Sequence, residues 1–77
     1  MKDNKKIVIG KKQTLRALKK SEAQKICIAK DADLHVTKPI KDACQELNVE
    51  IIYFDTMKEL GAFVGIDVNA AAAAVFK

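Results

Sequence analysis

The feature that most constrains the fold lies near the start of the chain, where an apolar run meets a glycine and a basic segment. The run Ile7-Val8-Ile9 is followed by Gly10 and then by Lys-Lys-Gln-Thr-Leu-Arg at positions 11–16. Three β-branched residues in a row favour a strand, and a glycine permits the tight turn that leads into a helix. The pattern predicts a strand over 7–9 and a helix over 11–20, which together open an α/β fold.

The predicted helix over 11–20 separates its cations from its leucines. On an ideal helix, an arc of about 120° holds the polar side chains Lys12, Gln13, Arg16, Lys19 and Lys20. Leu15 and Leu18 lie outside this arc and can face a core. A helix N-terminus beside cations suits a phosphate backbone, although a basic stripe alone is as typical of a solvated surface.

The positive charge is concentrated in the first part of the chain. Residues 1–30 hold ten Lys or Arg and two acids, and residues 31–77 hold four Lys and eight acids. The two net charges, +8 and −4, sum to the +4 of the whole chain. This asymmetry indicates an anionic partner for the N-terminal third.

The rest of the chain alternates between predicted strands and helices with short connections. Strands are predicted over 25–29 and over 51–54, the latter as a buried run with Tyr53 in the core. Between them, the i, i+3, i+4, i+7 spacing of an amphipathic helix is made by Ile40, Ala43, Cys44 and Leu47.

Capping signals bound the predicted helices. The segment 31–33 can cap the second helix, Pro39 suits a first helical turn rather than an interior, and Asn48 suits a left-handed end. The capping box at 56–59 opens a third helix, which Gly65 is placed to end. The apolar side of this third helix is predicted to consist of Leu60, Phe63 and Val64.

Length and composition limit the classes of protein. A chain of 77 residues suits one domain over 1–77, with residues 1–6 expected as a flexible basic N-terminus. No apolar run approaches the roughly 20 residues of a membrane span. We therefore expect no membrane partner and a cytoplasmic location.

The sequence holds no convincing catalytic group or metal site. The segment 10–12 lacks the upstream glycine and the Lys-Ser/Thr pair of a P-loop, and the hydroxyl groups have only His35 as a possible base. Cys27 and Cys44 lack a CxxC spacing and are predicted to be buried free thiols. His35 has no convergent metal ligands, so we expect no metal. Because no nucleophile with a base and no phosphate-binding loop is found either, we also expect no enzyme activity and no cofactor.

Four motifs resemble, in order and spacing, the L7Ae family of kink-turn-binding proteins. They are Gly10-Lys-Lys-Gln-Thr, Ile28-Ala-Lys-Asp-Ala-Asp33, Met57-Lys-Glu-Leu-Gly61 and Gly65-Ile-Asp-Val-Asn-Ala-Ala71. The resemblance covers roughly residues 7–76 and is greatest to the short bacterial members. It implies a single-domain α/β/α sandwich with a small four-stranded mixed sheet. It also implies a last strand near 73–76, although helix propensity favours a helix over 70–74.

The resemblance further implies an RNA site in which the first helix enters the major groove at tandem sheared G·A pairs. Lys12 and Gln13 stand where the family has Asn and Glu, and Arg16 stands at a cationic position. Lys12 can donate to guanine O6 and N7, and Gln13 can accept from a guanine amino group. Asp33 falls where the family has an acid near a flipped-out nucleotide, and Lys58 matches a basic residue.

The segment 66–71 is implied to form the other wall of this site. Its apolar side chains can pack on splayed bases, or Ile66 and Val68 can simply close the core. The whole set of implied RNA-binding residues is Gly10, Lys11, Lys12, Gln13, Arg16, Lys19, Asp33, Lys58, Ile66, Asp67, Val68, Asn69, Ala70 and Ala71.

Together these observations predict a monomeric RNA-binding protein. The expected partner is structured RNA with a kink-turn-like internal loop, whose bent form the protein would stabilise. Two alternatives remain: a structural ribosomal protein held by ribosomal RNA, and a generic anion-binding basic domain. An aromatic stacking platform is not expected, since the chain has no Trp and Tyr53 is assigned to a buried strand.

Overall fold

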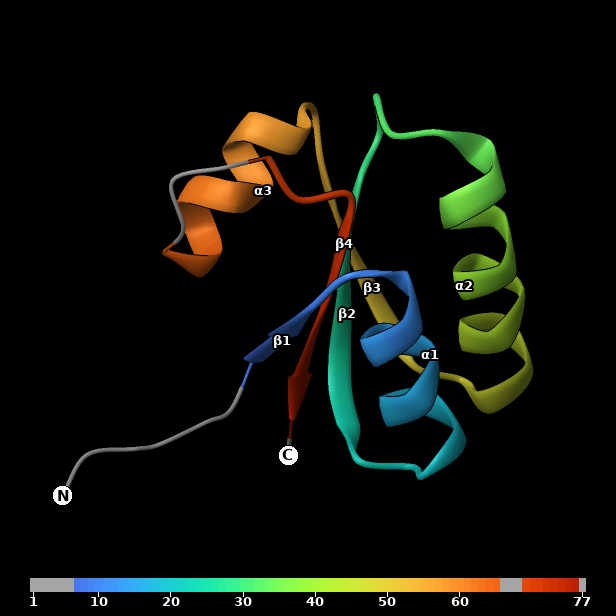
Figure 1. Cartoon of the computed structure of the whole chain (residues 1–77). Helices are drawn as coiled ribbons and strands as arrows, with labels where there is room; N and C mark the ends of the chain where they lie inside the picture. Colours follow the sequence, from blue (N-terminus) through green and yellow to red (C-terminus); the bar gives the residue numbers. More distant parts are fainter. Residues whose placement is uncertain (1–6, 66–68, 77) are drawn as a thin grey trace, which may run out of the picture.

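The computed structural model describes residues 7–65 and 69–76, and the predicted N-terminal segment 1–6 lies outside these ranges. In chain order, the elements are β1 (Ile7–Ile9), α1 (Lys11–Lys19), β2 (Ala23–Ala29), α2 (Leu34–Leu47), β3 (Glu50–Phe54), α3 (Met57–Val64) and β4 (Ala72–Phe76) (Figure 1). The predicted order of strands and helices is therefore confirmed. β2 begins two residues earlier than predicted, because its first residues still pair with β4.

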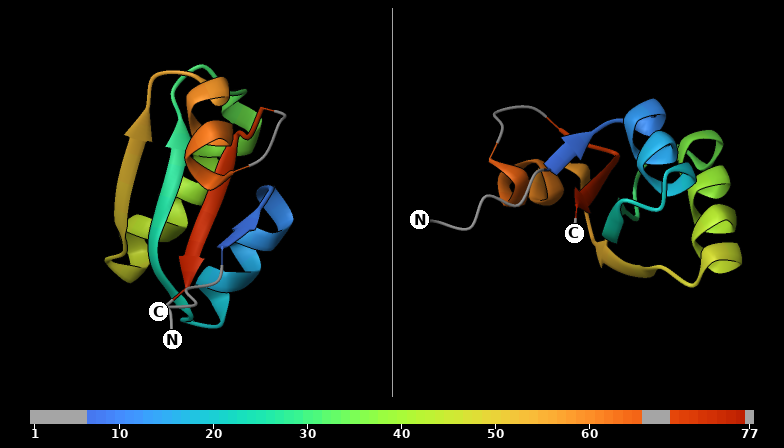
Figure 2. Two further views of the ribbon diagram at one scale, coloured as in Figure 1. Left: turned by 90° about the vertical axis from the view of Figure 1, so that its left-hand side faces the viewer. Right: turned by 90° about the horizontal axis from the view of Figure 1, so that it is seen from below.

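Within the described ranges, four strands form one mixed sheet in the order β1-β4-β2-β3, which Figure 2 shows side by side. β2 and β3 are parallel, whereas β4 is antiparallel to both β1 and β2. It follows that β1, β2 and β3 run in one direction and end at the same edge of the sheet. Each of these strands is followed by a helix, so α1, α2 and α3 all begin at that edge. We call it the loop edge, which is formed by Gly10, residues 30–33, residues 55–56 and residues 69–71.

The helices lie on both faces of the sheet. α1 and α2 cover one face and α3 covers the other (Figures 1 and 2). β2 supplies both cores by strand alternation: Ile26 and Ile28 are buried on the side of α1 and α2, and Cys27 and Ala29 on the side of α3. β4 divides in the same way. This arrangement is the α/β/α sandwich with a four-stranded mixed sheet that was predicted.

The alanine run of β4 is a strand rather than a helix. Its members at 72–74 are fully buried between β1 and β2, where both faces of the strand are covered. Small side chains allow the two helical layers to approach a central strand closely. Burial and strand pairing thus outweigh the helix propensity of alanine at these positions.

The predicted caps are largely confirmed. The carboxylate of Asp33 accepts from the backbone N–H two residues later at 2.9 Å, and the hydroxyl of Thr56 accepts from the N–H three residues later at 3.0 Å. Asn48 ends α2 with φ 57°, and Gly65 ends α3 with φ 85°. Both C-terminal residues are left-handed, as their types favour.

Two predictions are wrong, one about the place of Pro39 in its helix and one about the burial of the strand at 51–54. Pro39 lies inside α2 and not in its first turn, because Asp33 caps the helix and starts it at Leu34. The run 51–54 is not a buried strand, because β3 is an edge strand and pairs with β2 alone among the described strands. Tyr53 is accordingly 46% exposed, and the Nζ of Lys41 lies 5.6 Å from its ring centroid.

The apolar faces of two helices are also narrower than predicted. Leu47, in the last turn of α2, is 45% exposed, and Phe63 of α3 is 54% exposed. Phe63 packs its ring against Phe54 of the edge strand, with 5.1 Å between the ring centroids. The helical period assigns both side chains to the core-facing side, but neither belongs to the buried cores.

Candidate nucleic-acid interface

α1 begins at the loop edge with an open N-terminus. Gly10 precedes it with φ 111° and ψ 159°, and no described side chain caps the helix. The first backbone bond of α1 runs from the N–H of Thr14 to the carbonyl of Gly10 at 3.0 Å. The N–H groups of residues 11–13 therefore have no carbonyl partner within the helix, and they point toward the loop edge.

The side chains around this helix start are polar and exposed. Lys11, Lys12 and Gln13 are exposed, and the Oε1 of Gln13 lies 3.1 Å from where a Cβ would stand on Gly10. No acidic residue occupies the first turn. With the positive end of the helix dipole, this turn is favourable to an anion.

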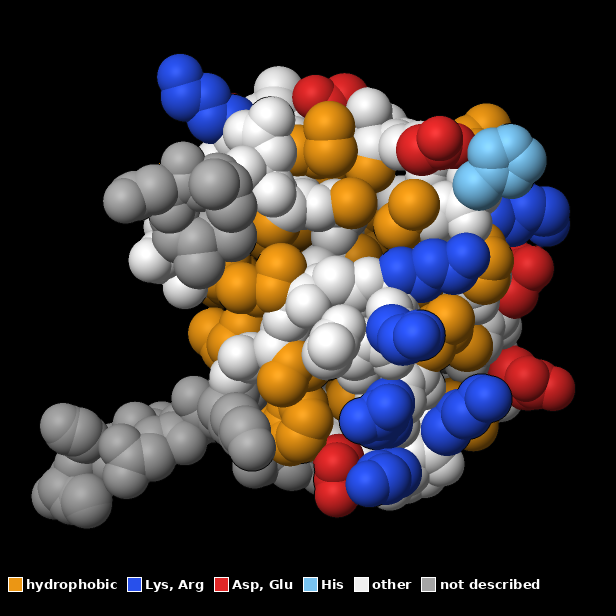
Figure 3. Space-filling view, viewed as in Figure 1, with side chains coloured by type: hydrophobic (Ala, Val, Ile, Leu, Met, Phe, Trp, Pro, Cys, Tyr) orange, Lys and Arg blue, Asp and Glu red, His pale blue; other side chains and the backbone are white. Residues whose placement is uncertain are grey.

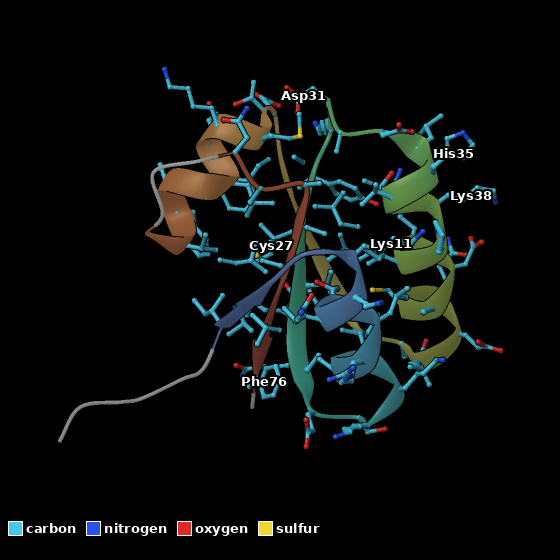
Figure 4. All side chains as sticks on the ribbon, in the orientation of Figure 1. Lys11, Cys27, Asp31, His35, Lys38 and Phe76 are labelled. Carbon is cyan, nitrogen blue, oxygen red and sulfur yellow. The ribbon has the colours of Figure 1, made fainter. Side chains whose placement is uncertain are left out.

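The cationic stripe of α1 continues away from the loop edge. Arg16 and Lys19 are exposed on it, while Leu15 is half-buried and Leu18 is buried, as the predicted helix faces require. Figure 3 shows Lys and Arg side chains gathered over α1, and Figure 4 labels Lys11 at its first turn. No cation of α1 forms an ion pair with another described residue. The ion pairs found in the described ranges are Lys30–Asp55 and Lys38–Asp42.

The start of β4 is held against the other elements of the loop edge. The carbonyl of Ala72 accepts from the N–H of Gly10, and the carbonyl of Ala71 accepts from the N–H of Ala29, both at 3.0 Å. Ala70 is buried and Asn69 is exposed. The structure thus places Ala72 against the turn into α1, and residues 69–71 directly precede it in the chain.

The remaining predicted site residues lie on other elements. Asp33 is exposed at the start of α2, where its carboxylate already accepts a backbone N–H. Lys58 is exposed in the first turn of α3, on the opposite face of the sheet from α1. Ile66, Asp67 and Val68 lie outside the described residues.

One contact at the loop edge has a different role from the one predicted. Asp31, expected to help cap the second helix, instead accepts with Oδ1 from the N–H of Met57 at 2.8 Å, at the start of α3. The partners are 26 residues apart in the chain. No local pattern signals such a contact, because it depends on two loops meeting at one edge of the sheet.

The two cysteines are buried free thiols, as predicted. Burial raises the pKa of Cys44 to about 11, and burial also raises the pKa of Cys27, against a smaller opposing effect of Lys25. Both groups are thus protonated thiols near neutral pH, and the two lie in opposite cores of the sandwich. Within residues 7–65 and 69–76, no group of three His, Cys, Asp or Glu is arranged to hold a metal ion. Over the same ranges, no helix has the length and apolar character to span a membrane.

The fold places the chain in the class of small single-domain α/β/α proteins, here with a basic helix that begins at the loop edge. The family model described as "Ribosomal protein L7Ae/L30e/S12e/Gadd45 family" matches residues 1–77, and the chain belongs to this family. The resemblance inferred from four short motifs is thereby confirmed.

Relatives of similar length carry RNA-binding names. An RNA-binding protein of Caldanaerobacter subterraneus subsp. tengcongensis is 55% identical over 67 residues, which are 87% of this chain and 82% of that protein. RNA-binding protein YbxF of Geobacillus stearothermophilus is 47% identical over 72 residues, 94% of this chain and 88% of that protein. The solved structure of the Giardia lamblia 15.5kD RNA binding protein has a TM-score of 0.86 at 24% identity, covering 92% of this chain and 60% of that one. This last similarity supports the fold.

Proposed function

We propose that this chain binds structured RNA as a monomer and stabilises kink-turn-like internal loops with sheared G·A pairs. The observation that carries the proposal is the open N-terminus of α1, beside exposed cations and next to residues 69–71. Backbone N–H groups and the helix dipole at such an end favour phosphate or base acceptors. Family membership and the RNA-binding names of the bacterial relatives support RNA as the anion.

Each part of the surface has a separate role in this proposal. Lys12 and Gln13 contact base edges in the widened groove, because a cation can donate to guanine O6 and N7 and a carboxamide can accept from an amino group. Lys11, Arg16 and Lys19 contact phosphates and set the register. The turn at Gly10 allows the backbone to approach the RNA.

The second wall receives the unpaired nucleotides of the loop. Residues 66–71 cover them, with the apolar members Ile66, Val68 and Ala71 against splayed bases. Asp33 accepts a donor from an extruded base, and Lys58 holds a phosphate on the far side of the site. Bases outside a helix expose the faces and edges that such a wall contacts.

The mechanism is differential binding and needs no cofactor. An internal loop of this kind exchanges between extended and bent forms, and a ligand that binds the bent form more tightly shifts the population toward it. The shift is limited by the difference in affinity between the two forms. This mechanism therefore requires no catalytic pocket.

The decisive experiment compares two RNAs of equal length and phosphate number. One contains the sheared G·A pairs, and in the other these pairs are replaced by Watson–Crick pairs. We expect the replacement to weaken binding by about 4 kcal/mol or more, the usual gap between specific and non-specific binding. A titration in which both RNAs bind equally would reject kink-turn recognition and favour a generic basic domain.

A structural role in the ribosome is the second candidate, favoured by the ribosomal proteins in the family description. It uses the same surface with ribosomal RNA as the partner. Sedimentation of cell extracts at moderate salt separates the two: a ribosome component travels with a subunit in near-equal amount, and a free cytoplasmic regulator stays in the light fractions. Sequencing the RNA that copurifies with the protein then names the target.

A further inference from the structure

We propose that Asp31 is a positioning residue for the RNA surface: through α3 it holds the start of β4 in place beside α1. This inference rests on the proposed function, since it concerns the geometry of the same surface. Figure 4 shows Asp31 at the loop edge, where the end of β2 meets the beginning of α3. Asp31 belongs to the loop before α2, yet its partner belongs to α3.

The first step is the bond from the N–H of Met57 to Oδ1 of Asp31 at 2.8 Å. Hydrogen bonds to an ionised acceptor are stronger than neutral ones, and a carboxylate at a helix N-terminus also interacts favourably with the helix dipole. Of the three described helices, α3 is the one on its face of the sheet. A side-chain contact at its first residue therefore fixes where the helix begins relative to β2.

The second step passes from α3 to the start of β4. The carbonyl of the same residue, Met57, accepts from the N–H of Ala70 at 3.1 Å. The two residues after Ala70 bond to other elements. The carbonyl of Ala71 accepts from the N–H of Ala29 in β2, and the carbonyl of Ala72 accepts from the N–H of Gly10 before α1. Residues 70–72 thus form backbone hydrogen bonds with three elements. The bond to α3 depends on the side chain of Asp31, because Asp31 holds the residue of α3 that accepts it, Met57.

The direction of the affinity change on removing Asp31 distinguishes the role of its charge from the role of its hydrogen bond. Asp31 is exposed and is in no ion pair with a described residue. If its charge alone mattered, its removal would strengthen binding to a polyanion, because RNA repels an acid. If its hydrogen bond matters, removal weakens binding to the kinked RNA despite that gain.

The test measures affinities of Asp31→Ala and Asp31→Asn for the G·A RNA and its Watson–Crick counterpart. We expect Asp31→Ala to bind the G·A RNA up to about tenfold more weakly, because ordering the start of β4 would then take place on binding, and the energy of one charge-assisted bond sets the upper limit of that cost. Its binding to the straight RNA should be unchanged or slightly tighter. Asp31→Asn keeps an acceptor oxygen and should stay within about threefold of the parent. The control is Asp55→Ala, which removes the same charge from another exposed side chain of the loop edge, together with its surface ion pair to Lys30, and should not weaken binding.

A second variant deletes the same bond from its donor side. Met57→Pro removes the N–H at the first position of α3, where proline is favoured, and Thr56 before it is already extended. It should lower the preference for the G·A RNA as Asp31→Ala does, and the two changes together should cost less than their sum. If Asp31→Ala does not fold, Met57→Pro carries the test.

Amide hydrogen exchange supplies a measurement without RNA. In Asp31→Ala, the N–H of Ala70 should exchange faster, while amides in the centre of β2 keep their protection. Unchanged exchange at Ala70, or an Asp31→Ala variant that binds the G·A RNA as tightly as the parent, would overturn the inference. Equal binding of both RNAs by the parent protein would instead reject the proposed function, so the two failures are distinguishable.

Discussion

α1 and α3 begin at the same edge of one sheet, yet their first turns are opposite in character. In α3, Thr56 accepts from the N–H of Glu59, Asp31 accepts from the N–H of the first helical residue, and Glu59 adds an acid. In α1, Gly10 stands in the capping position, no described side chain caps the helix, and lysines occupy the first turn. In α3, the N–H groups of Met57 and Glu59 thus have side-chain acceptors, whereas no described side chain caps the first N–H groups of α1.

This difference has a cost in stability for α1. A side-chain cap contributes about 1 kcal/mol to a helix, and cations near the N-terminus oppose the helix dipole by a few tenths of a kcal/mol each. α1 lacks the first contribution and carries the second penalty. A bound phosphate would reverse both, so the site is expected to be more stable with its ligand than without it.

The largest expected effect concerns the two glycines with positive φ, one before α1 and one after α3. Gly10→Ala should lower the free energy of unfolding by about 3 kcal/mol, because its backbone region is nearly exclusive to glycine and its Cβ would meet Gln13 at 3.1 Å. Gly65→Ala should cost only about 1 kcal/mol, because nothing lies within 4 Å of its Cβ. Urea denaturation of both variants measures the difference. Equal losses would show that the entry into α1 is not specially constrained.

Sequence reasoning succeeds here where local chemistry decides the structure. The helix faces of α1, the caps at Asp33 and Thr56 and the left-handed end at Asn48 follow from spacing and residue type, and they are confirmed. The edge position of β3, and with it the exposure of Tyr53, could not be predicted, because strand order is a tertiary property. The same reason hides the partner of Asp31.

The candidate site also has one part that the sequence could predict and one part that it could not. That cations line one side of α1 is a matter of helical period, and the exposure of Arg16 and Lys19 agrees with it. That Ala72, which follows residues 69–71, lies beside Gly10 depends on β4 pairing between β1 and β2. The family resemblance implied this proximity, but no pattern in the residues themselves did.

The next prediction compares cations on the two helices. Arg16→Ala should weaken binding to the G·A RNA by about 1–3 kcal/mol and reduce the slope of log K against log salt by about 1, with the melting temperature unchanged. Lys58→Ala, on α3, should weaken it by less than about 1 kcal/mol, since the proposed complex gives Lys58 one peripheral phosphate contact. Titrations at several salt concentrations, with a thermal melt of each variant, measure both effects. If the two losses are equal, α1 is not the principal contact.

The smallest expected change in the free energy of unfolding gives the sharpest test of the open N-terminus of α1, because stability and RNA affinity should change in opposite directions. Lys12→Glu places an acid in the first turn of α1 and should raise the free energy of unfolding by about 0.3–1 kcal/mol. The control Lys19→Glu makes the same charge change in the last turn, where it should lower that free energy by a similar amount. Either glutamate lies within one turn of Arg16, so both variants add a local pair, and both the dipole and the more favourable Glu-before-Arg order stabilise the variant at position 12.

Binding completes this comparison. Lys12→Glu should weaken binding to the G·A RNA more than about tenfold, since in the proposed complex an acid would replace a base-edge donor in the groove. Lys19→Glu should weaken it less, since a phosphate contact at the far end of the stripe is lost. A Lys12→Glu variant that is more stable and binds as tightly as the parent would show that the RNA does not approach the N-terminus of α1. The same stability gain with lost binding means that residues suited to RNA occupy this turn at the expense of the helix itself.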